Sequence, residues 1–254
     1  MAKHVIAVLN QKGGVGKTTT VVNLAIYLKK MGKSVLVIDI DPQGNATSGL
    51  GVNKQLIAAS TKELMLGAAP IEQIVVQVEG GVHLIPTNQE LAALEVELVR
   101  SSAREYRLRH AIESSNYDYV IIDCPPSLSL LTVNALSAAD SILIPVQSEY
   151  YALEGLSQLL EVVQLVKNGL NPNLDILGVL LTMHDRRNSL SEQVKAEVEK
   201  HFGDKLFTTV VPRNVRLAEA PSHGKTIESY DKRSKGARAY QHLAKEVHKR
   251  AAKS

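Results

Sequence analysis

The feature that most restricts the possible folds of this chain is a segment rich in lysine and glycine near its N-terminus. It reads NQKGGVGKTTT over residues 10–20, between a short apolar run at 4–10 and an amphipathic segment at 17–31. Glycines allow a tight loop whose successive N–H groups point at one anion, and a following helix adds the positive end of its dipole. A strand, such a loop and a helix in this order predict a phosphate-binding loop.

The remaining apolar runs predict a sheet with helices on both faces. Buried strands are expected at residues 34–39, 119–123, 141–146, 175–181 and 206–211, with an extra edge strand at 82–86. Helices are expected at residues 88–102, 104–115, 128–139, 151–168, 191–202 and 237–251. Strands that are apolar on both faces and alternate with helices indicate a mostly parallel, doubly wound α/β sheet. Because no linker or repeat interrupts this pattern, we expect a single domain over residues 1–254.

Composition excludes several classes of protein. A single cysteine excludes an intrachain disulfide, a C-x-x-C redox pair and a zinc or iron–sulfur site built from several cysteines of one chain. Aromatic residues make up only 4% and tryptophan is absent, which argues against a surface for stacking bases or sugars. The sequence has neither a signal-peptide pattern nor an apolar run of about 18 residues, so we expect a cytoplasmic protein.

The charges are distributed unevenly along the chain. Residues 1–182 carry 13 lysines and arginines against 17 acidic residues, whereas residues 183–254 carry 16 against 9. The C-terminal third is therefore basic, which is typical of a protein that binds a polyanion. A solvated, lysine-rich surface without such a partner gives the same composition, so charge alone leaves both interpretations open.

The loop differs in one respect from the common phosphate-loop pattern G-x-x-x-x-G-K-[ST]. Gln11 stands where that pattern has its first glycine, and an additional Lys12 follows it. The resulting sequence KGGVGKTT resembles the deviant Walker A motif of the ParA/MinD family of ATPases. This family implies a P-loop fold, which agrees with the doubly wound sheet expected from the apolar runs.

The resemblance extends well beyond the loop. VLVIDIDPQGN at residues 35–45 matches the next motif of the family, and VIIDCPP at 120–126 resembles its Walker B element. Further matches are EYYALEG at 149–155 and PRNVRLAEAPS at 212–222, so the resemblance covers nearly the whole chain. It is closest to the small chromosomal ParA type, which lacks an N-terminal helix-turn-helix domain.

The resemblance implies that the loop binds ATP with Mg²⁺. Lys17 would contact the β- and γ-phosphates, and the Thr18 hydroxyl would coordinate the metal ion. Lys12 would reach the ATP of a second protomer, which implies a homodimer when ATP is bound. The nucleotide-binding residues are then Lys12, Gly13, Gly14, Val15, Gly16, Lys17, Thr18 and Thr19 of the loop, with Pro212 and Asn214 near the base. The chain lacks the N-K-x-D sequence of many GTPases and a G-x-G-x-x-G after a strand, which disfavours guanine and dinucleotides.

Three aspartates at strand ends are candidates for the chemistry of hydrolysis. Asp41 matches the family residue that positions or activates the attacking water, and Asp123 matches the one that holds Mg²⁺ through a water. Asp39 lies close enough along the chain to assist with the metal, although a role in capping a turn is an equal alternative. Gly13 matches a position where a missing side chain lets two protomers approach, with local loop geometry as the alternative. The catalytic residues implied are therefore Lys12, Lys17 and Asp41.

Two arginines of the basic third match positions at which ParA proteins of this type contact DNA. These are Arg187 and Arg216, for which an intramolecular salt bridge is the alternative. Further candidates are Arg186, Lys225, Lys232, Arg233, Lys235 and Arg238. Contacts with phosphates carry no base information, so binding to double-stranded DNA is expected to be nonspecific and sensitive to salt. The function implied is an ATP-driven switch in chromosome or plasmid partitioning, located on the nucleoid and acting with a ParB-type centromere-binding protein.

Other functions remain as alternatives. A MinD-like membrane switch in division-site placement needs a C-terminal amphipathic helix with bulky apolar residues free to insert. Here the stripe Tyr240, Leu243, Ala244 and Val247 is expected to dock on the core, and we expect no membrane partner. An iron–sulfur carrier needs at least two cysteines in each subunit. A binding module with a dead site is disfavoured because Lys12, Lys17, Thr18, Asp41 and Asp123 are all present.

Overall fold

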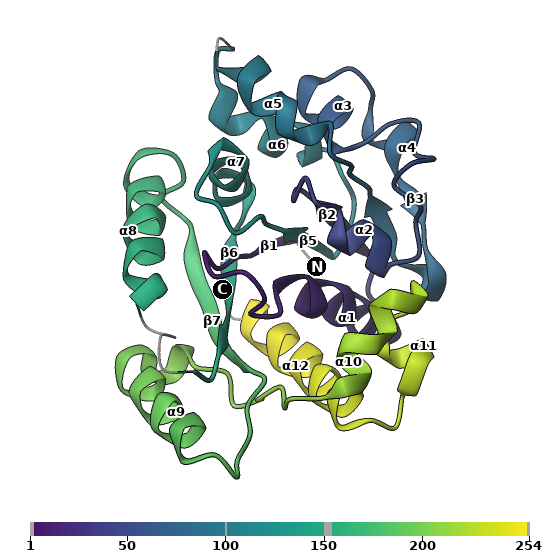
Figure 1. Cartoon of the computed structure of the whole chain (residues 1–254). Helices are drawn as coiled ribbons and strands as arrows, with labels where there is room; N and C mark the ends of the chain where they lie inside the picture. Colours follow the sequence, from purple (N-terminus) through teal and green to yellow (C-terminus); the bar gives the residue numbers. More distant parts are fainter. Residues whose placement is uncertain (1–2, 100, 150–153, 253–254) are drawn as a thin grey trace.

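A seven-stranded sheet forms the centre of the molecule, in the order β3-β4-β2-β5-β1-β6-β7. The computed structural model describes residues 3–99, 101–149 and 154–252 (Figure 1). The strands are β1 (His4–Val8), β2 (Val35–Asp39), β3 (Val76–Gln77), β4 (His83–Ile85), β5 (Tyr119–Asp123), β6 (Ser141–Gln147) and β7 (Asp175–Thr182). All neighbouring strands are parallel except β3, which is antiparallel to β4. The prediction of a mostly parallel, doubly wound sheet is confirmed.

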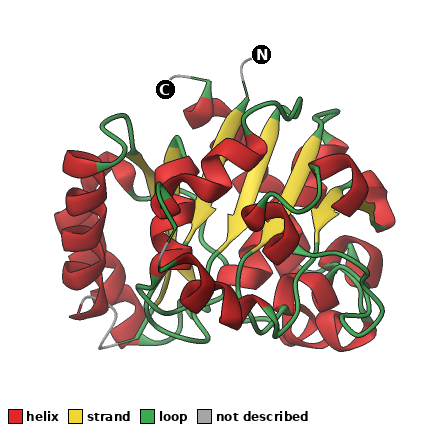
Figure 2. Ribbon diagram, turned by 90° about the horizontal axis from the view of Figure 1, so that it is seen from above, coloured by secondary structure: helices red, strands yellow, loops and turns green. Residues whose placement is uncertain are grey.

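Helices cover both faces of this sheet, as Figures 1 and 2 show. The helices are α1 (Lys17–Lys30), α2 (Asn45–Gly49), α3 (Thr61–Leu66), α4 (Ile71–Ile74), α5 (Leu91–Leu98), α6 (Arg107–Ile112), α7 (Leu130–Ala138), α8 (Glu154–Gly169), α9 (Ser189–Phe202), α10 (Val215–Glu219), α11 (Ile227–Asp231) and α12 (Lys235–Ala251). Strand β1 explains why the strand sequences are apolar throughout. Val5 and Ala7 face the core shared with α5 to α8, whereas Ile6 and Val8 face the core shared with α1 and α12.

Two strand predictions need correction. The segment expected at the edge of the sheet forms β4 inside it, because the short β3 pairs with β4 and becomes the edge. The prediction of a strand at 206–211 is wrong, since the segment forms no strand and only Leu206 makes an isolated bridge, with Val179 of β7. Its backbone N–H groups at Thr208 and Thr209 donate to the Glu246 carboxylate, at 2.8 and 3.0 Å, and not to a strand. The Phe207 and Val211 N–H groups donate to the Val179 and Leu181 carbonyls of β7, both at 2.9 Å, so the segment follows β7 only in part.

The predicted helices are present in the structure, but several differ from the prediction in length. The helix expected at 104–115 is split into a 3-10 turn at Arg104–Tyr106 followed by α6, and the one expected at 88–102 shortens to α5. The helix expected at 151–168 corresponds to α8, and residues 151–153 of that prediction lie outside the described residues. The short elements between residues 45 and 77 were not predicted, because windows of four to six residues carry no periodicity.

The register of the central strands places their carboxyl ends at one level. Val8 at the end of β1 pairs with Asp123 of β5, which in turn pairs with Asp39 of β2. Figure 2 shows the arrowheads of the central strands directed toward this same edge of the sheet. In open α/β sheets this edge carries the binding site, so the register brings the predicted loop and aspartates together.

Candidate functional site

The glycine-rich loop leaves β1 and ends where α1 begins at Lys17. Gly14 and Gly16 have φ angles of +76° and +90°, a conformation in which other residues are strained. Gly13 is different, because its φ is not positive and a Cβ placed there meets no atom within 4 Å. The protomer itself therefore requires glycine at positions 14 and 16 but has room for a side chain at position 13.

Side chains from the loop and from distant strands hold the loop in shape. The Thr182 hydroxyl at the end of β7 donates to the Val15 carbonyl at 2.8 Å. The Asn10 amide donates to the Pro145 carbonyl of β6 at 2.7 Å, while its oxygen accepts from the Lys12 N–H at 3.0 Å. The loop is thus fixed in place by β6 and β7 before any ligand binds, which lowers the entropic cost of binding.

Lys17 points back into the loop and is largely buried. Its side chain is part of a residue only 7% exposed, and the ammonium donates to the Lys12 carbonyl at 3.2 Å. Burial lowers the pKa of Lys17, against the opposing effect of the nearby Asp123 and Asp41 carboxylates. A buried ammonium with one neutral acceptor is well suited to an anion held by the surrounding N–H groups.

The Thr18 hydroxyl and the Asp123 carboxylate form a hydrogen-bonded pair beside the loop. The Thr18 hydroxyl donates to Asp123 Oδ2 at 2.8 Å, and Asp123 is fully buried. Asp123 Oδ1 is also buried and has no hydrogen-bond partner among the described residues. Burial raises the pKa of Asp123 well above its usual range, and the neighbouring Asp39 raises it further. A hydroxyl and a carboxylate with one unpartnered oxygen fit Mg²⁺, which prefers such hard oxygen ligands.

The other two aspartates have different surroundings. Asp39 accepts from the Thr47 N–H and hydroxyl at 2.8 and 2.7 Å and from the Asp41 N–H at 3.2 Å. These bonds occupy its carboxylate in organising the turn into α2, so the geometry favours the turn role over a metal ligand. Asp41 is 7% exposed and accepts only from the Gln43 N–H, at 3.0 Å, among the described residues. One of its oxygens is therefore available for a water.

Lys12 makes a contact that sequence reasoning missed. Its ammonium lies 3.3 Å from Glu149 Oε2, and Arg213 approaches the other oxygen of Glu149 at 3.7 Å. The Lys12 side chain is 40% exposed, so it faces outward and not into its own loop. Lys12 and Glu149 are 137 residues apart, and no sequence signal could have paired them.

The segment proposed for the base lies beside the end of β7. Pro212 forms an isolated bridge with His184, and the Arg213 N–H donates to the His184 carbonyl at 3.2 Å. The Asn214 side chain caps α10 by accepting from the Arg216 N–H at 2.9 Å. The backbone of this segment is thus brought near the loop side of β7, and its role toward a base stays a prediction.

Both arginines predicted to contact DNA form ion pairs within the protomer. Arg187 binds both carboxylate oxygens of Asp185 at 3.1 and 3.0 Å. Arg216 lies 2.9 Å from Glu219 and 3.8 Å from Asp231. The two arginine side chains are 91% and 55% exposed. Exposed pairs of this kind contribute little stability, so both guanidinium groups can exchange their carboxylates for phosphates.

The apolar stripe of α12 docks on α1, as expected. Tyr240, Leu243 and Val247 are at most 1% exposed, and the Tyr240 hydroxyl lies 3.2 Å from Thr20 Oγ1 of α1. These side chains are not free to enter a lipid surface in this arrangement. Within the described part of the chain, no helix is long and apolar enough to cross a bilayer.

Comparisons with known proteins converge on one group. The AAA domain family matches residues 3–176. The chain is 58% identical to the sporulation initiation inhibitor protein Soj of Bacillus subtilis, covering 96% of this chain and 97% of that protein. It is 50% identical to the chromosome partitioning protein ParA of Caulobacter vibrioides, with coverages of 96% and 93%. A similar solved structure is cobyrinic acid a,c-diamide synthase of Mycobacterium smegmatis with a bound ATP analogue and magnesium, at 36% identity, a TM-score of 0.87 and coverages of 96% and 93%.

Proposed function

The chain belongs to the ParA/Soj family of chromosome-partitioning ATPases, and from this premise we propose that it is a Mg²⁺-dependent, ATP-driven dimerising switch on DNA. The observation that carries the catalytic part is the buried, unpartnered Asp123 Oδ1 beside the Thr18 hydroxyl and the buried Lys17 ammonium. These three groups lie beside a loop in which Gly14 and Gly16 adopt positive φ angles. A similar solved protein carries an ATP analogue and magnesium, which supports the same ligands here.

The residues have separate roles in hydrolysis. Lys17 leaves the Lys12 carbonyl to bind the β- and γ-phosphates, where charge develops in the transition state. Thr18 and Asp123 would hold Mg²⁺, and the ion would supply further neutralisation of the phosphate charge. Asp41 uses its available oxygen to orient the water that attacks the γ-phosphate. Asp39 keeps Asp41 in place through the bond to its N–H.

Dimerisation depends on the outward face of the loop. Lys12 is exposed and held only by an exposed carboxylate, so a partner's nucleotide can take it from Glu149. Gly13 lies next to it, with open space where a Cβ would stand. Because the protomer does not need glycine at this position, we infer that the approach of a second protomer does.

We expect Gly13→Val to separate nucleotide binding from dimerisation. A Cβ at position 13 meets no atom of its own protomer within 4 Å, so ATP affinity should stay within about twofold, while the ATP-induced dimer should be lost by steric clash. Size-exclusion chromatography with light scattering, with and without ATP, measures this directly. Gly169→Val, at an exposed glycine with the same open space, serves as the control and should dimerise normally. A Gly13→Val protein that dimerises with ATP contradicts the proposed interface.

DNA binding follows from dimerisation, because two protomers double the number of phosphates that are neutralised. Arg187 and Arg216 exchange their exposed carboxylate partners for phosphates, with no preference for sequence. Hydrolysis of ATP then separates the two protomers, which releases the DNA. A ParB-type protein is proposed to stimulate this step on the nucleoid, in chromosome or plasmid partitioning.

We expect Arg216→Ala to weaken binding to all DNA sequences alike without affecting the ATP-bound dimer. The dependence of log affinity on log salt should become shallower by about 0.9 for each phosphate that is no longer neutralised, or about 1.8 for a dimer. Titration of two unrelated duplexes at several salt concentrations provides the measurement. Arg109→Ala, which removes an exposed arginine on α6, should leave affinity and slope unchanged. Weaker binding confined to one sequence, or wild-type affinity and slope, contradicts the role.

A further inference from the structure

The end of strand β7 joins the glycine-rich loop to the segment proposed for the base, residues 211–214, which we call the base segment. The Thr182 hydroxyl donates to the Val15 carbonyl of the loop at 2.8 Å. Two residues later, the backbone of His184 pairs with Pro212 of the base segment. A nucleotide needs its phosphates and its base held at a fixed separation, and three consecutive residues connect the two parts that would hold them.

The residue between Thr182 and His184 has a strained backbone. Met183 has a φ angle of +50°, in the left-handed region that residues with a side chain rarely adopt. Such a conformation persists only where neighbouring contacts fix it. Thr182 is fixed on one side by its bond to the loop, and the contacts of His184 hold the other side.

The His184 side chain is anchored at both ring nitrogens. It is only 3% exposed, and its Nδ1 lies 3.2 Å from Oγ of Ser148, the residue that follows β6. Its Nε2 lies 3.0 Å from a carboxylate oxygen of Glu192 on α9. Because an ionised carboxylate can only accept, Nε2 carries a proton and donates to Glu192. The ring is therefore tied to the end of β6 and to α9, which fixes the position of the His184 backbone.

The His184 backbone holds the base segment on both sides of Pro212. The His184 N–H donates to the Val211 carbonyl at 3.1 Å, and the Arg213 N–H donates to the His184 carbonyl at 3.2 Å. Pro212 has no N–H of its own, so the bonds of its two neighbours fasten the segment at this point. Both of those bonds go to His184.

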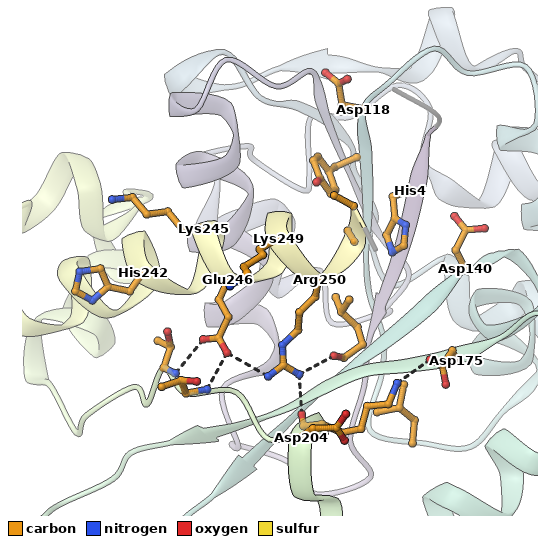
Figure 3. Close-up of a pocket in the computed structure, with 18 of the residues that line it drawn as sticks. His4, Asp118, Asp140, Asp175, Asp204, His242, Lys245, Glu246, Lys249 and Arg250 are labelled. Atoms are coloured by element: carbon orange, nitrogen blue, oxygen red, sulfur yellow. Dashed lines mark hydrogen bonds and ion pairs between the residues drawn. The ribbon is translucent and has the colours of Figure 1, made fainter. Parts of the chain in front are cut away.

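The chain just before the base segment is held independently of His184. The Thr208 and Thr209 N–H groups donate to the Glu246 carboxylate of α12, which Figure 3 shows in a pocket between α12 and the strands. Loss of the His184 ring should therefore loosen the base segment near Pro212 without detaching the whole connection between β7 and α10.

We propose that His184 is a positioning residue for the base of the bound nucleotide. It holds the base segment in place before the nucleotide arrives, which lowers the entropic cost of binding. Because His184 acts through this segment and not through the phosphate loop, its loss should weaken only the part of the affinity that the base contributes. The inference rests on the proposed nucleotide binding, with Pro212 and Asn214 near the base.

The test compares two ligands, of which only one carries a base. ADP with Mg²⁺ presents phosphates, ribose and base and has no γ-phosphate to hydrolyse, while pyrophosphate with Mg²⁺ presents phosphates alone. In calorimetric titrations, His184→Ala should bind ADP about tenfold more weakly, as expected for the loss of one or two neutral hydrogen bonds. Its affinity for pyrophosphate should stay within about twofold of wild type.

Steady-state hydrolysis of ATP gives an independent readout. In His184→Ala the KM for ATP should rise about tenfold while kcat stays within about twofold of wild type, because contacts with the base are the same in the ground state and the transition state. An unchanged KM with a lower kcat contradicts a role toward the base.

A histidine at the opposite edge of the sheet is the matched control. His4 begins β1, and its Nε2 lies 2.9 Å from Oγ of Ser141, the first residue of β6. Figure 3 shows His4 at the pocket on that edge, near Asp140. His4→Ala likewise removes a ring that is hydrogen-bonded to a serine at an end of β6, and it should bind ADP and pyrophosphate like wild type.

Two further variants separate positioning from folding. His184→Gln keeps an amide that can donate to Glu192, and it should restore ADP binding to within about threefold of wild type. Glu192→Ala removes a half-exposed partner of the ring and should weaken ADP binding about threefold, with pyrophosphate binding unchanged. If His184→Ala fails to fold, these two variants carry the test.

Wild-type ADP binding by both His184→Ala and Glu192→Ala overturns the inference. An equal loss of ADP and pyrophosphate binding in His184→Ala also overturns it, because the residue would then act on the phosphate loop or on the fold. If Lys17→Ala abolishes binding of both ligands and His184→Ala changes neither, only this inference fails. If the wild-type protein binds neither ligand, the proposed function fails as well.

Discussion

Lys17→Ala is expected to lower the affinity for Mg·ATP by about 10² to 10⁴-fold and to abolish turnover. The substitution removes the buried ammonium of the loop, and each charge-assisted hydrogen bond to a phosphate contributes about 1.5–3 kcal/mol. Two such bonds, to the β- and γ-phosphates, give the range above, since each 1.4 kcal/mol is a factor of about ten. Calorimetric titration with ATP and Mg²⁺, together with a phosphate-release assay, measures both effects.

The stability of this variant distinguishes loss of binding from loss of folding. Burial lowers the pKa of Lys17, which means that the folded loop without ligand disfavours the charged form. Removing that charge should therefore leave the free energy of unfolding unchanged or slightly higher. Lys29→Ala, near the end of the same helix, is the control and should bind ATP normally. Full turnover by Lys17→Ala would show that the loop is not the phosphate site.

Asp41→Ala is expected to bind ATP and dimerise while hydrolysing it about 10² to 10⁴ times more slowly. The phosphate cradle and the Thr18–Asp123 pair remain, but the carboxylate that orients the water is gone. The protein should therefore accumulate as an ATP-bound dimer, which sizing and phosphate release measured on the same sample would detect. A monomeric or fully active Asp41→Ala protein contradicts the assignment.

Asp41→Asn distinguishes a role of Asp41 in hydrolysis from a role in holding the turn after β2. Asparagine keeps an oxygen that can accept from the Gln43 N–H, so the turn after β2 is preserved. It lacks the negative charge that a base needs, and we expect the same loss of hydrolysis as with alanine. Wild-type rates in Asp41→Asn would mean that the residue acts only by holding the turn.

The sequence was sufficient where local pattern and strand register act together. The loop, β2 and β5 were each recognisable, and parallel strands necessarily bring their carboxyl ends to one edge. Asp39 and Asp123 therefore lie at the same level, next to the end of β1, as expected. Buried apolar strands also indicated both cores correctly, because Val5 and Ile6 had to face different helices.

Features that depend on contacts between distant residues could not be predicted. Nothing in the sequence indicated that the Glu246 carboxylate would accept from the Thr208 and Thr209 N–H groups. The contact of Lys12 with Glu149 is of the same kind. The pairing of Arg216 with Glu219, by contrast, could have been predicted from the i, i+3 spacing on a helix.

The packing of α12 on α1 sets an order of events while the chain is being synthesised. Thr20 lies two residues after Thr18 and meets Tyr240, 220 positions further along the chain, in one buried core. Until the ribosome has delivered α12, the part of α1 that packs on α12 has no cover, although α1 can already pack on β1, β2 and β5. The nucleotide site is thus among the first parts to be translated and among the last to mature. A nascent chain that stalls before α12 exposes an apolar, incompletely packed helix to chaperones and proteases, and it lacks a mature nucleotide site.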